Sequence, residues 1–449
     1  MPTPEQRFSR LVGEAQRDSR LPSLAAAVFR DGKVEWSQGI GLADVQAGVE
    51  ATVDTQYAVA SITKTFTAVS VMQLREEGTL DLDDPLERHL PDVAHGSLSL
   101  GRMLAHASGL QREPPGEIWE TLVFPEAEEL LASLPEAEQV LPGATAWHYS
   151  NLAYALLGQV VARIVGRPFR EHVEERLLRP LGLSRTTWGF EAPHARPYFV
   201  EPYSDSVQRE PELDLGGKGG ESGLCSTLGD LARWGSFLCD PDESHLAPAT
   251  VDQMHEVRIM AEPDWTLGWG LGIELWRRGA RIFGGHTGGF PGFISMLVYS
   301  RRERIGAVML TNSGLWPKAT DTGLRLLEAA LEELAPAPEP WVPAEAPPAE
   351  VAPLLGRWWS EGHEFVFSWR LGRLEARTAT APAERAPSVF EAEGSDRFRT
   401  VSGDERGELL RVVRDEGGEV VKLYWATYPF TRAPEIFGTP SNSPEAQVP

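Results

Sequence analysis

The sequence predicts an α/β fold for a large N-terminal domain, followed by a small antiparallel β domain. Strand patterns occur near the start of the chain and return before residue 312, with helical patterns between them. This order indicates one α/β domain with a helical insertion. A length of 449 residues allows roughly two to four domains, so a second, smaller unit fits the chain.

The strands of the large domain are predicted from apolar, β-branched runs bounded by turn residues. Asp31-Gly32, between two such runs, favours a tight hairpin. The predicted strands are Leu24–Phe29, Lys33–Gly39, Leu271–Trp276, Arg281–Gly285, Gly292–Tyr299 and Gly306–Thr311.

The helices are predicted from apolar residues at helical spacing, ended by glycine where the chain must turn. Gly78 and Gly166 each follow such a run. The predicted helices are Ile62–Glu77, Leu152–Val165, Pro168–Leu178 and Thr322–Leu334.

The domain boundary is predicted from a change in composition. Residues 1–334 form the large domain, and the segment 335–352, rich in proline and alanine, is typical of an extended linker. Residues 353–438 then show alternating apolar residues between glycine-bearing turns, which predicts a small β-barrel. Residues 439–449 are expected to be a flexible tail.

Charge and cysteine content exclude several classes of protein. Lys and Arg number 42 and Asp and Glu 65, a net charge of −23, which argues against nucleic acid or an anionic membrane as partner. The N-terminal segment lacks the pattern of a signal peptide, so we expect a cytoplasmic protein. Cys225 and Cys239 are expected to be free buried thiols. No motif indicates a metal or a cofactor.

The first chemical motif is Ser61-Ile62-Thr63-Lys64 at the start of a predicted helix. Residues three apart lie on one helical face, and a serine there needs a base such as a neutral lysine to become a nucleophile. Taken alone, the motif is better explained by Ser61 capping the helix, with Lys64 facing water. The apolar character of the rest of the helix favours the catalytic interpretation, because a lysine is rarely buried unless a partner or a function holds it there.

Two further elements follow in the chain. Tyr149-Ser150-Asn151 precedes an apolar helix, where Tyr149 could relay a proton and Asn151 could bind an amide or cap the helix. His286-Thr287-Gly288-Gly289 lies in a glycine-rich stretch between two strand candidates. Glycines there would let a substrate approach a strand edge and would offer an N–H to an oxyanion.

With these motifs in this order, the sequence resembles the serine β-lactamase and penicillin-binding-protein superfamily in its class C-like branch, which includes D,D-carboxypeptidases, D-aminopeptidases and esterases. Met103–Leu110, Pro142-Gly143 and Arg179–Leu183 are similar to other landmarks of that branch. The resemblance spans about residues 20–330 and implies an antiparallel sheet flanked by helices, with a helical subdomain. The C-terminal β domain is similar to the lipocalin-like modules of some peptidases in the branch.

The resemblance also implies catalytic roles. Ser61 would attack a carbonyl and form an acyl-enzyme, while Lys64 and Tyr149 share the proton transfers, with the identity of the base left open. The backbone N–H groups of Ser61 and Gly289 would form the oxyanion hole.

Asn151, His286, Thr287 and Gly288 would bind the substrate. Position 286 is a departure, because the motif of the superfamily has lysine there and histidine is mostly neutral at pH 7. In so acidic a chain this predicts a neutral or amine-bearing substrate rather than an anionic one.

We therefore expect a serine hydrolase that cleaves an amide or ester in a small molecule or short peptide, favouring peptides with D-amino acids. The alternatives are a carboxylesterase or weak β-lactamase, and a catalytically silent binding or assembly protein that keeps the fold. Assembly into a homo-oligomer is left open.

Overall fold

A computed structural model describes the chain except for residues 1, 214–218, 335–339, 345, 383–384 and 436–449. The chain forms two compact units, residues 1–337 and 338–449. The predicted tail 439–449 lies outside the described residues, as do parts of the predicted linker. The linker residues 340–344, which are described, form neither helix nor strand.

The first unit is built on a nine-stranded antiparallel sheet in the order β3-β2-β1-β13-β12-β11-β10-β9-β8. The early strand β1 pairs with the late strand β13, so the two ends of the unit's sequence meet at the centre of the sheet. The predicted α/β domain with a helical insertion is thus confirmed. The strands are β1 (Ser23–Arg30), β2 (Lys33–Asp44), β3 (Val49–Glu50), β8 (Ile259–Met260), β9 (Leu267–Trp269), β10 (Glu274–Arg278), β11 (Arg281–Phe290), β12 (Phe293–Ser300) and β13 (Ile305–Thr311).

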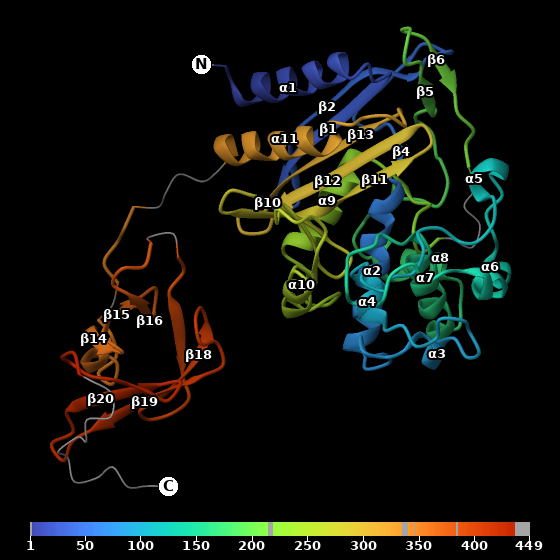
Figure 1. Ribbon diagram of the computed structural model, residues 1–449. Coiled ribbons are helices and arrows are strands. Elements are labelled where there is room, and N and C mark those ends of the chain that lie inside the picture. The colour runs from blue at the N-terminus through green and yellow to red at the C-terminus, as the bar shows by residue number, and fades with distance from the viewer. Residues whose placement is uncertain (1, 214–218, 335–339, 345, 383–384, 436–449) are drawn as a thin grey trace. The chain divides into compact units, whose positions relative to one another are not determined.

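Helices cover both faces of this sheet (Figure 1). On one face lie α1 (Pro4–Asp18) and α11 (Ala319–Leu334), and on the other lies α9 (Leu228–Cys239). Alternate residues of β1 face the two layers, with Val28 in the core beneath α1 and α11 and Phe29 in the larger core on the opposite face. A strand buried on both faces is therefore apolar throughout rather than alternating.

The helical insertion lies beyond one edge of the sheet (Figure 1). Its central helix α2 is buried from Thr63 to Leu74, so it runs through the core. The predicted helix Pro168–Leu178 continues beyond α8 as a wider π turn, Glu174–Leu178. The remaining helices are α2 (Thr63–Glu76), α3 (Leu86–His89), α4 (Leu100–Leu104), α5 (Ile118–Thr121), α6 (Ala127–Ser133), α7 (Asn151–Val165), α8 (Phe169–Val173) and α10 (Pro248–Met254).

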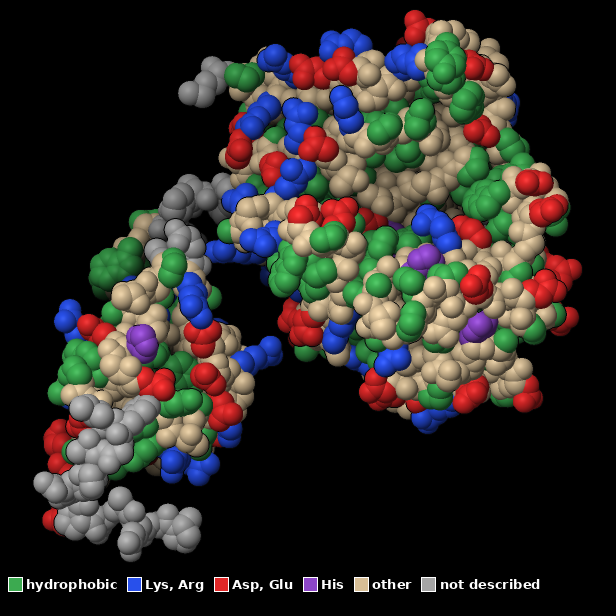
Figure 2. All heavy atoms as spheres, viewed as in Figure 1, with side chains coloured by type: hydrophobic (Ala, Val, Ile, Leu, Met, Phe, Trp, Pro, Cys, Tyr) green, Lys and Arg blue, Asp and Glu red, His purple; other side chains and the backbone are tan. Residues whose placement is uncertain are grey.

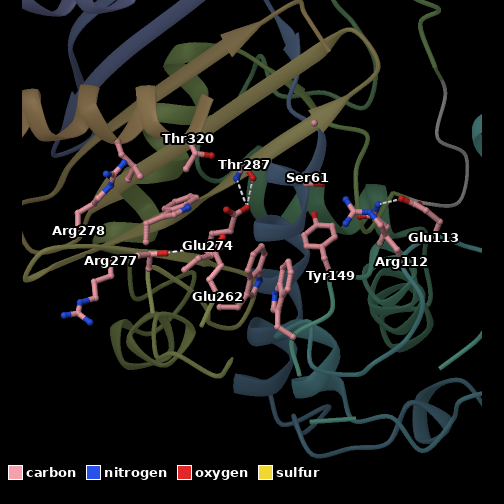
Figure 3. Close-up of a pocket in the computed structure, with 18 of the residues that line it drawn as sticks. Ser61, Arg112, Glu113, Tyr149, Glu262, Glu274, Arg277, Arg278, Thr287 and Thr320 are labelled. Atoms are coloured by element: carbon pink, nitrogen blue, oxygen red, sulfur yellow. Dashed lines mark hydrogen bonds between the residues drawn. The ribbon is translucent and has the colours of Figure 1, made fainter. Parts of the chain in front are cut away.

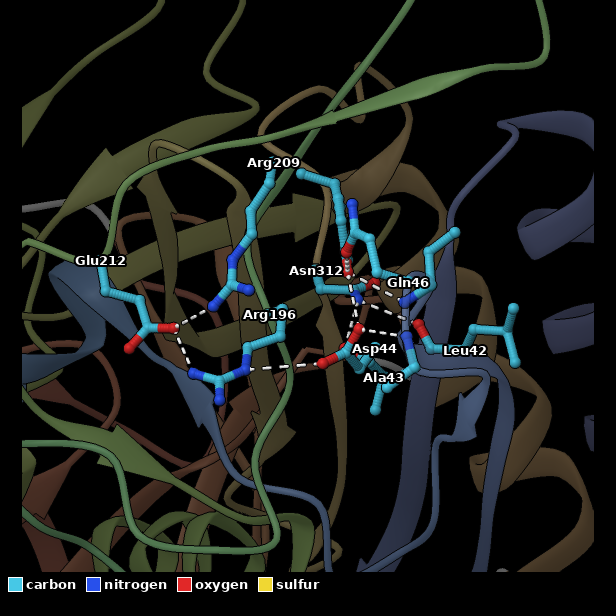
Figure 4. Close-up of polar contacts among 11 residues, drawn as sticks. Leu42, Ala43, Asp44, Gln46, Arg196, Arg209, Glu212 and Asn312 are labelled. Carbon is cyan, nitrogen blue, oxygen red and sulfur yellow. Dashed lines mark hydrogen bonds and ion pairs between the residues drawn. The ribbon is translucent and has the colours of Figure 1, made fainter.

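Two short strand pairs tie loops to this framework. They are β4 (Tyr57–Ala58) with β7 (Cys225–Ser226), and β5 (Tyr198–Val200) with β6 (Val207–Arg209). Near β5, Arg196 links Asp44, at the end of β2, to Glu212 (Figure 4). This polar cluster fastens the β5–β6 segment to the central sheet.

The second unit is an eight-stranded antiparallel barrel whose strands are neighbours in chain order. Its first and last strands meet through Trp359 and Thr431, whose backbones exchange two hydrogen bonds of 2.9 and 3.0 Å. This closure confirms the predicted barrel. The strands are β14 (Gly356–Ser360), β15 (His363–Arg370), β16 (Arg373–Thr378), β17 (Ser388–Ala392), β18 (Arg397–Ser402), β19 (Leu409–Arg414), β20 (Val420–Trp425) and β21 (Tyr428–Phe430).

Cys225 and Cys239 are buried free thiols, as predicted. Among the described residues, no helix has both the length and the apolar character needed to cross a membrane.

Candidate active site

Ser61 lies in a single 3₁₀ turn, Ala60–Ile62, directly before α2. Ala60 has φ of 47°, in the left-handed region that a residue with a Cβ rarely adopts. Strained residues of this kind cluster at functional sites, where the surrounding structure holds them in place. The turn places Ser61 at the N-terminal end of a buried helix, where the helix dipole favours developing negative charge.

Lys64, the second residue of α2, is completely buried. Its Nζ lies 3.0 Å from the Oγ of Ser61 and donates to the carbonyl oxygen of Glu221 at 2.8 Å. The predicted proximity of Ser61 and Lys64 is therefore present. The interpretation in which Lys64 faces water is wrong, because the helix that carries it runs through the core.

Tyr149 completes a cluster around the Ser61 hydroxyl. Its phenol is hydrogen-bonded to Ser61, and the Nζ of Lys64 lies 5.1 Å from the centre of its ring. Burial raises the pKa of Tyr149 well above its usual range, and the hydrogen bond to Ser61 offsets only part of this effect. Tyr149 is thus a protonated phenol in the resting site.

The helix after Tyr149 is capped by Ser150, not by Asn151. Asn151 instead lines the pocket and donates from Nδ2 to Oε1 of Glu113 at 2.6 Å. A side-chain amide has two N–H donors. One of them is held by Glu113, which leaves the other for a carbonyl group.

The segment His286–Gly289, expected between strands, lies inside β11, which extends to Phe290. Side chains alternate across a strand. Accordingly Thr287 and Gly289 line the pocket, whereas His286 and Gly288 are buried away from it. Two of the four residues of His286–Gly289 therefore lie directly at the pocket.

Beyond Gly285 the strand β11 has one free edge, because β10 ends its pairing at Glu274. The N–H of Thr287 points to this edge, since it donates to Oε1 of Glu274 at 3.0 Å. Backbone N–H directions repeat every second residue along a strand. The N–H of Gly289 therefore points to the same open edge, as an oxyanion donor must.

Gly288 has a role in spacing. A Cβ at this position would lie 2.2 Å from both the carbonyl oxygen of Val59 and the Oγ of Ser295. Only glycine lets β11 approach the turn that carries Ser61 so closely.

His286 is fully buried, and its Nδ1 lies 2.6 Å from the carbonyl oxygen of Thr287. Burial lowers the pKa of His286 to about 3, and the charge of nearby Lys64 contributes in the same direction. The imidazole is neutral at pH 7 and supplies no cation where the superfamily motif has lysine.

Glu274 is a pocket residue that sequence reasoning missed. It is 5% exposed and accepts from both the N–H and the Oγ1 of Thr287, at 3.0 and 2.7 Å. Burial raises its pKa to about 7, against the lowering effect of these hydrogen bonds. A lone carboxylate within the otherwise apolar run Leu271–Trp276 was the indication that could have identified it.

These groups surround one pocket of about 870 Å³ (Figure 3). Aromatic walls are formed by Trp119, Trp147 and Trp269. Charged side chains of both signs also line it, namely Arg112, Arg277 and Arg278 with Glu113, Glu262 and Glu274. The net negative charge of the whole chain therefore does not extend into the pocket, where arginine and glutamate side chains are equal in number.

Known proteins share this fold. A model of the beta-lactamase family matches residues 8–331, and a second model, described as a domain of unknown function (DUF7586), matches residues 347–432. The chain therefore belongs to the beta-lactamase family, and the resemblance to serine β-lactamases and penicillin-binding proteins is confirmed.

Relatives differ in how much of the chain they share. Protein flp of Staphylococcus aureus is 23% identical over 69% of this chain, and the chain spans only 63% of its length. The structure of SurE is 25% identical, covers 96% of this chain and 99% of its own, and superposes with a TM-score of 0.63. Two further structures resemble this one.

The first is a D-stereospecific amidohydrolase from Streptomyces sp., which is 25% identical over 72% of this chain and 98% of its own, with a TM-score of 0.61. The second is an octameric penicillin-binding protein homologue from Pyrococcus abyssi, 23% identical over 94% of this chain and 99% of its own, with a TM-score of 0.64.

Proposed function

We propose that the chain is a serine hydrolase that cleaves an amide or ester through an acyl-enzyme on Ser61. The observation that carries this proposal is the Ser61 hydroxyl, 3.0 Å from Lys64 Nζ and hydrogen-bonded to Tyr149. A nucleophile needs an adjacent proton acceptor and a nearby oxyanion site, and Gly289 supplies the second.

The reaction follows from these positions. The Oγ of Ser61 bonds to the substrate carbonyl carbon while its proton passes to the Lys64–Tyr149 pair. The oxyanion is held by the N–H groups of Ser61 and Gly289. The tetrahedral intermediate then collapses, the amine or alcohol leaves with the proton, and water releases the acyl group by the same steps in reverse.

The raised pKa of Tyr149 bears on the choice of base. A phenol that stays protonated relays a proton readily, but it first has to lose one before it can act as a base. We assign Tyr149 the relay to the leaving group and Lys64 the first proton transfer, for which Lys64 must be neutral.

The favoured substrate is a small amide or peptide that contains a D-amino acid. Two observations support this class: the similar structures include a D-stereospecific amidohydrolase and SurE bound to D-Leu, and the aromatic walls of the pocket suit an apolar side chain. Self-assembly stays a prediction, supported by the octameric state of the Pyrococcus homologue.

Labelling of the full chain with a fluorescent fluorophosphonate tests the acyl-enzyme. We expect stoichiometric labelling of the parent protein and none of Ser61→Ala, whose turnover should fall by roughly 10⁴-fold. Equal labelling of both proteins would exclude Ser61 as the nucleophile.

A panel of substrates separates the alternatives. It contains D- and L-aminoacyl amides, p-nitrophenyl esters, a chromogenic cephalosporin and a D-Ala-D-Ala peptide. We expect the D-aminoacyl amides to be the fastest amides. Turnover of esters alone would indicate a carboxylesterase, turnover of the cephalosporin alone a β-lactamase, and no turnover with no labelling a silent binding protein.

A further inference from the structure

We propose that Glu274 is a specificity-determining residue that makes the Thr287 end of the pocket reject a free substrate carboxylate. This inference rests on the proposed hydrolase function and sharpens its substrate class. Glu274 lies on β10, and its carboxylate accepts the hydrogen bonds of Thr287 on the neighbouring strand β11 that a substrate would otherwise accept.

Thr287 is the residue at which one end of an extended substrate would arrive. A peptide with its scissile carbonyl at Ser61 and Gly289, lying along the free edge of β11, reaches Thr287 two residues further along that strand. Backbone N–H groups on one side of a strand are about 7 Å apart. One extended substrate residue spans about 3.3–3.6 Å, and the hydrogen bonds at its two ends cover the remaining distance. A terminal carboxylate would therefore lie beside Thr287, where it would need hydrogen-bond donors.

Both donors of Thr287 are already used. Its N–H and its Oγ1–H both point to Oε1 of Glu274, at 3.0 and 2.7 Å. An incoming carboxylate would find no free donor on Thr287 and would meet a second carboxylate instead.

The position of Glu274 strengthens this repulsion. Glu274 is 5% exposed, it lies on a strand, and two hydrogen bonds fix the orientation of its side chain. Two negative charges close together repel strongly where burial limits the water that can screen them. The neighbouring His286 is neutral and offers no compensating charge.

The arginines of the pocket do not cancel the effect at this end. Arg277 and Arg278 are on the same strand as Glu274 but are exposed to solvent, where Arg278 is paired with Asp321 at 2.8 Å and Arg277 donates to the carbonyl oxygen of Gly279. Arg112 lies on the opposite side of Tyr149 from Glu274 and Thr287, with its guanidinium 4.8 Å from the centre of the Tyr149 ring (Figure 3). An anionic group of a substrate can be received there, away from Thr287. Rejection is thus local to one end of the pocket.

The test compares two D-Ala-D-Ala peptides that differ only at the C-terminus, one a free acid and one a carboxamide, at pH 8. We expect the full-length parent protein to cleave the amide with kcat/KM about tenfold above the acid, because protonating a Glu274 with a pKa of about 7 costs about a factor of ten at pH 8. Glu274→Gln keeps a hydrogen-bond acceptor for Thr287 but removes the charge, and should reduce this preference at least fivefold. The matched control, Glu262→Gln, removes an exposed carboxylate from the same pocket and should leave the preference unchanged.

Two outcomes overturn the inference: a parent protein that prefers the acid, and a preference that Glu274→Gln and Glu262→Gln change equally or not at all. Fluorophosphonate labelling of Ser61, run in parallel, reports the proposed function separately. Calorimetric binding of both peptides to Ser61→Ala tests the preference without turnover. The amide should bind more tightly than the acid, and equal binding, or binding of neither, also overturns the inference.

Discussion

The imidazole of His106 stacks on the phenol ring of Tyr149, with ring centroids 4.2 Å apart and planes inclined by 25°. His106 is completely buried, and its Nδ1 accepts a hydrogen bond of 3.0 Å from the N–H of Ser150. Burial lowers the pKa of His106 well below its usual range, so the ring is neutral. His106 thus positions Tyr149 through packing and through the backbone that follows it.

The substitution His106→Asn should lower kcat about tenfold with a smaller change in KM, because it retains an acceptor for Ser150 but loses the ring that holds Tyr149. Since neutral His106 does not titrate near pH 7, the limbs of the pH–rate profile should stay in place. The control His95→Asn alters a half-buried histidine bonded to the carbonyl of Ala137 and should keep the parent kcat. A folded His106→Asn protein with full kcat would contradict the positioning role.

Gly288→Ala and Gly289→Ala add the same methyl group at adjacent positions of β11. The first would force the strand away from Val59 and Ser295, whereas a Cβ at Gly289 meets nothing within 4 Å. We expect Gly288→Ala to cost about 1–3 kcal/mol of unfolding free energy and most of the activity. Gly289→Ala keeps its N–H and should stay near parent stability. Urea unfolding and kinetics of both variants decide this, and equal losses would contradict it.

Much of the fold could be predicted from sequence because the patterns that indicate its strands, turns and helices involve residues close together in the chain. The hairpin at Asp31-Gly32 and the helix that ends at Gly166 depend on residues adjacent in the chain, and both are present. The extent of β11 was not predicted, because glycines in His286–Gly289 look like a loop when the neighbouring turn of Val59 is unknown.

The residues of the site likewise divide into those that the sequence predicts and those that only the structure brings together. Ser61 and Lys64 are three residues apart on one helix, so their proximity follows from helix geometry. The contacts of Glu274 with Thr287 and of Asn151 with Glu113 join residues 13 and 38 positions apart, and no local pattern specifies such pairs. The charges around the pocket therefore could not be predicted from sequence alone. The position of Arg112 beside Tyr149 is another example.

The unfolding free energy of the protein should depend on pH through the titration of Glu274. Its folded pKa, about 7, lies above the ordinary value of 4.5, so the stability it contributes is present below pH 4.5 and lost as the pH rises to 7. Glu274→Gln does not titrate. Its unfolding free energy relative to the parent should therefore rise by about 2–3 kcal/mol between pH 5 and pH 8.

Urea unfolding of both proteins at the two pH values measures this difference. The charged and titratable groups around Glu274, namely Lys64, Tyr149 and His286, are the same in both proteins and cancel in the comparison. A relative stability that does not change with pH would show that Glu274 has an ordinary pKa in the folded state.

The attachment of the β5–β6 segment should depend on Arg196 more than on Arg209. Arg196 bridges Asp44 and Glu212, with 30% of its side chain exposed, whereas Arg209 is 45% exposed and, among the residues that the structure describes, forms an ion pair with Glu212 only (Figure 4). Partly exposed ion pairs contribute little singly, and more when one cation joins two carboxylates. Arg196→Ala should therefore lower the unfolding free energy by about 1 kcal/mol, and Arg209→Ala by less. The difference should shrink in 1 M salt, which screens exposed charges. An equal loss for both variants would mean that hydrogen bonds such as that from the N–H of Arg196 to the carbonyl of Ala43, which both variants keep, hold the segment instead.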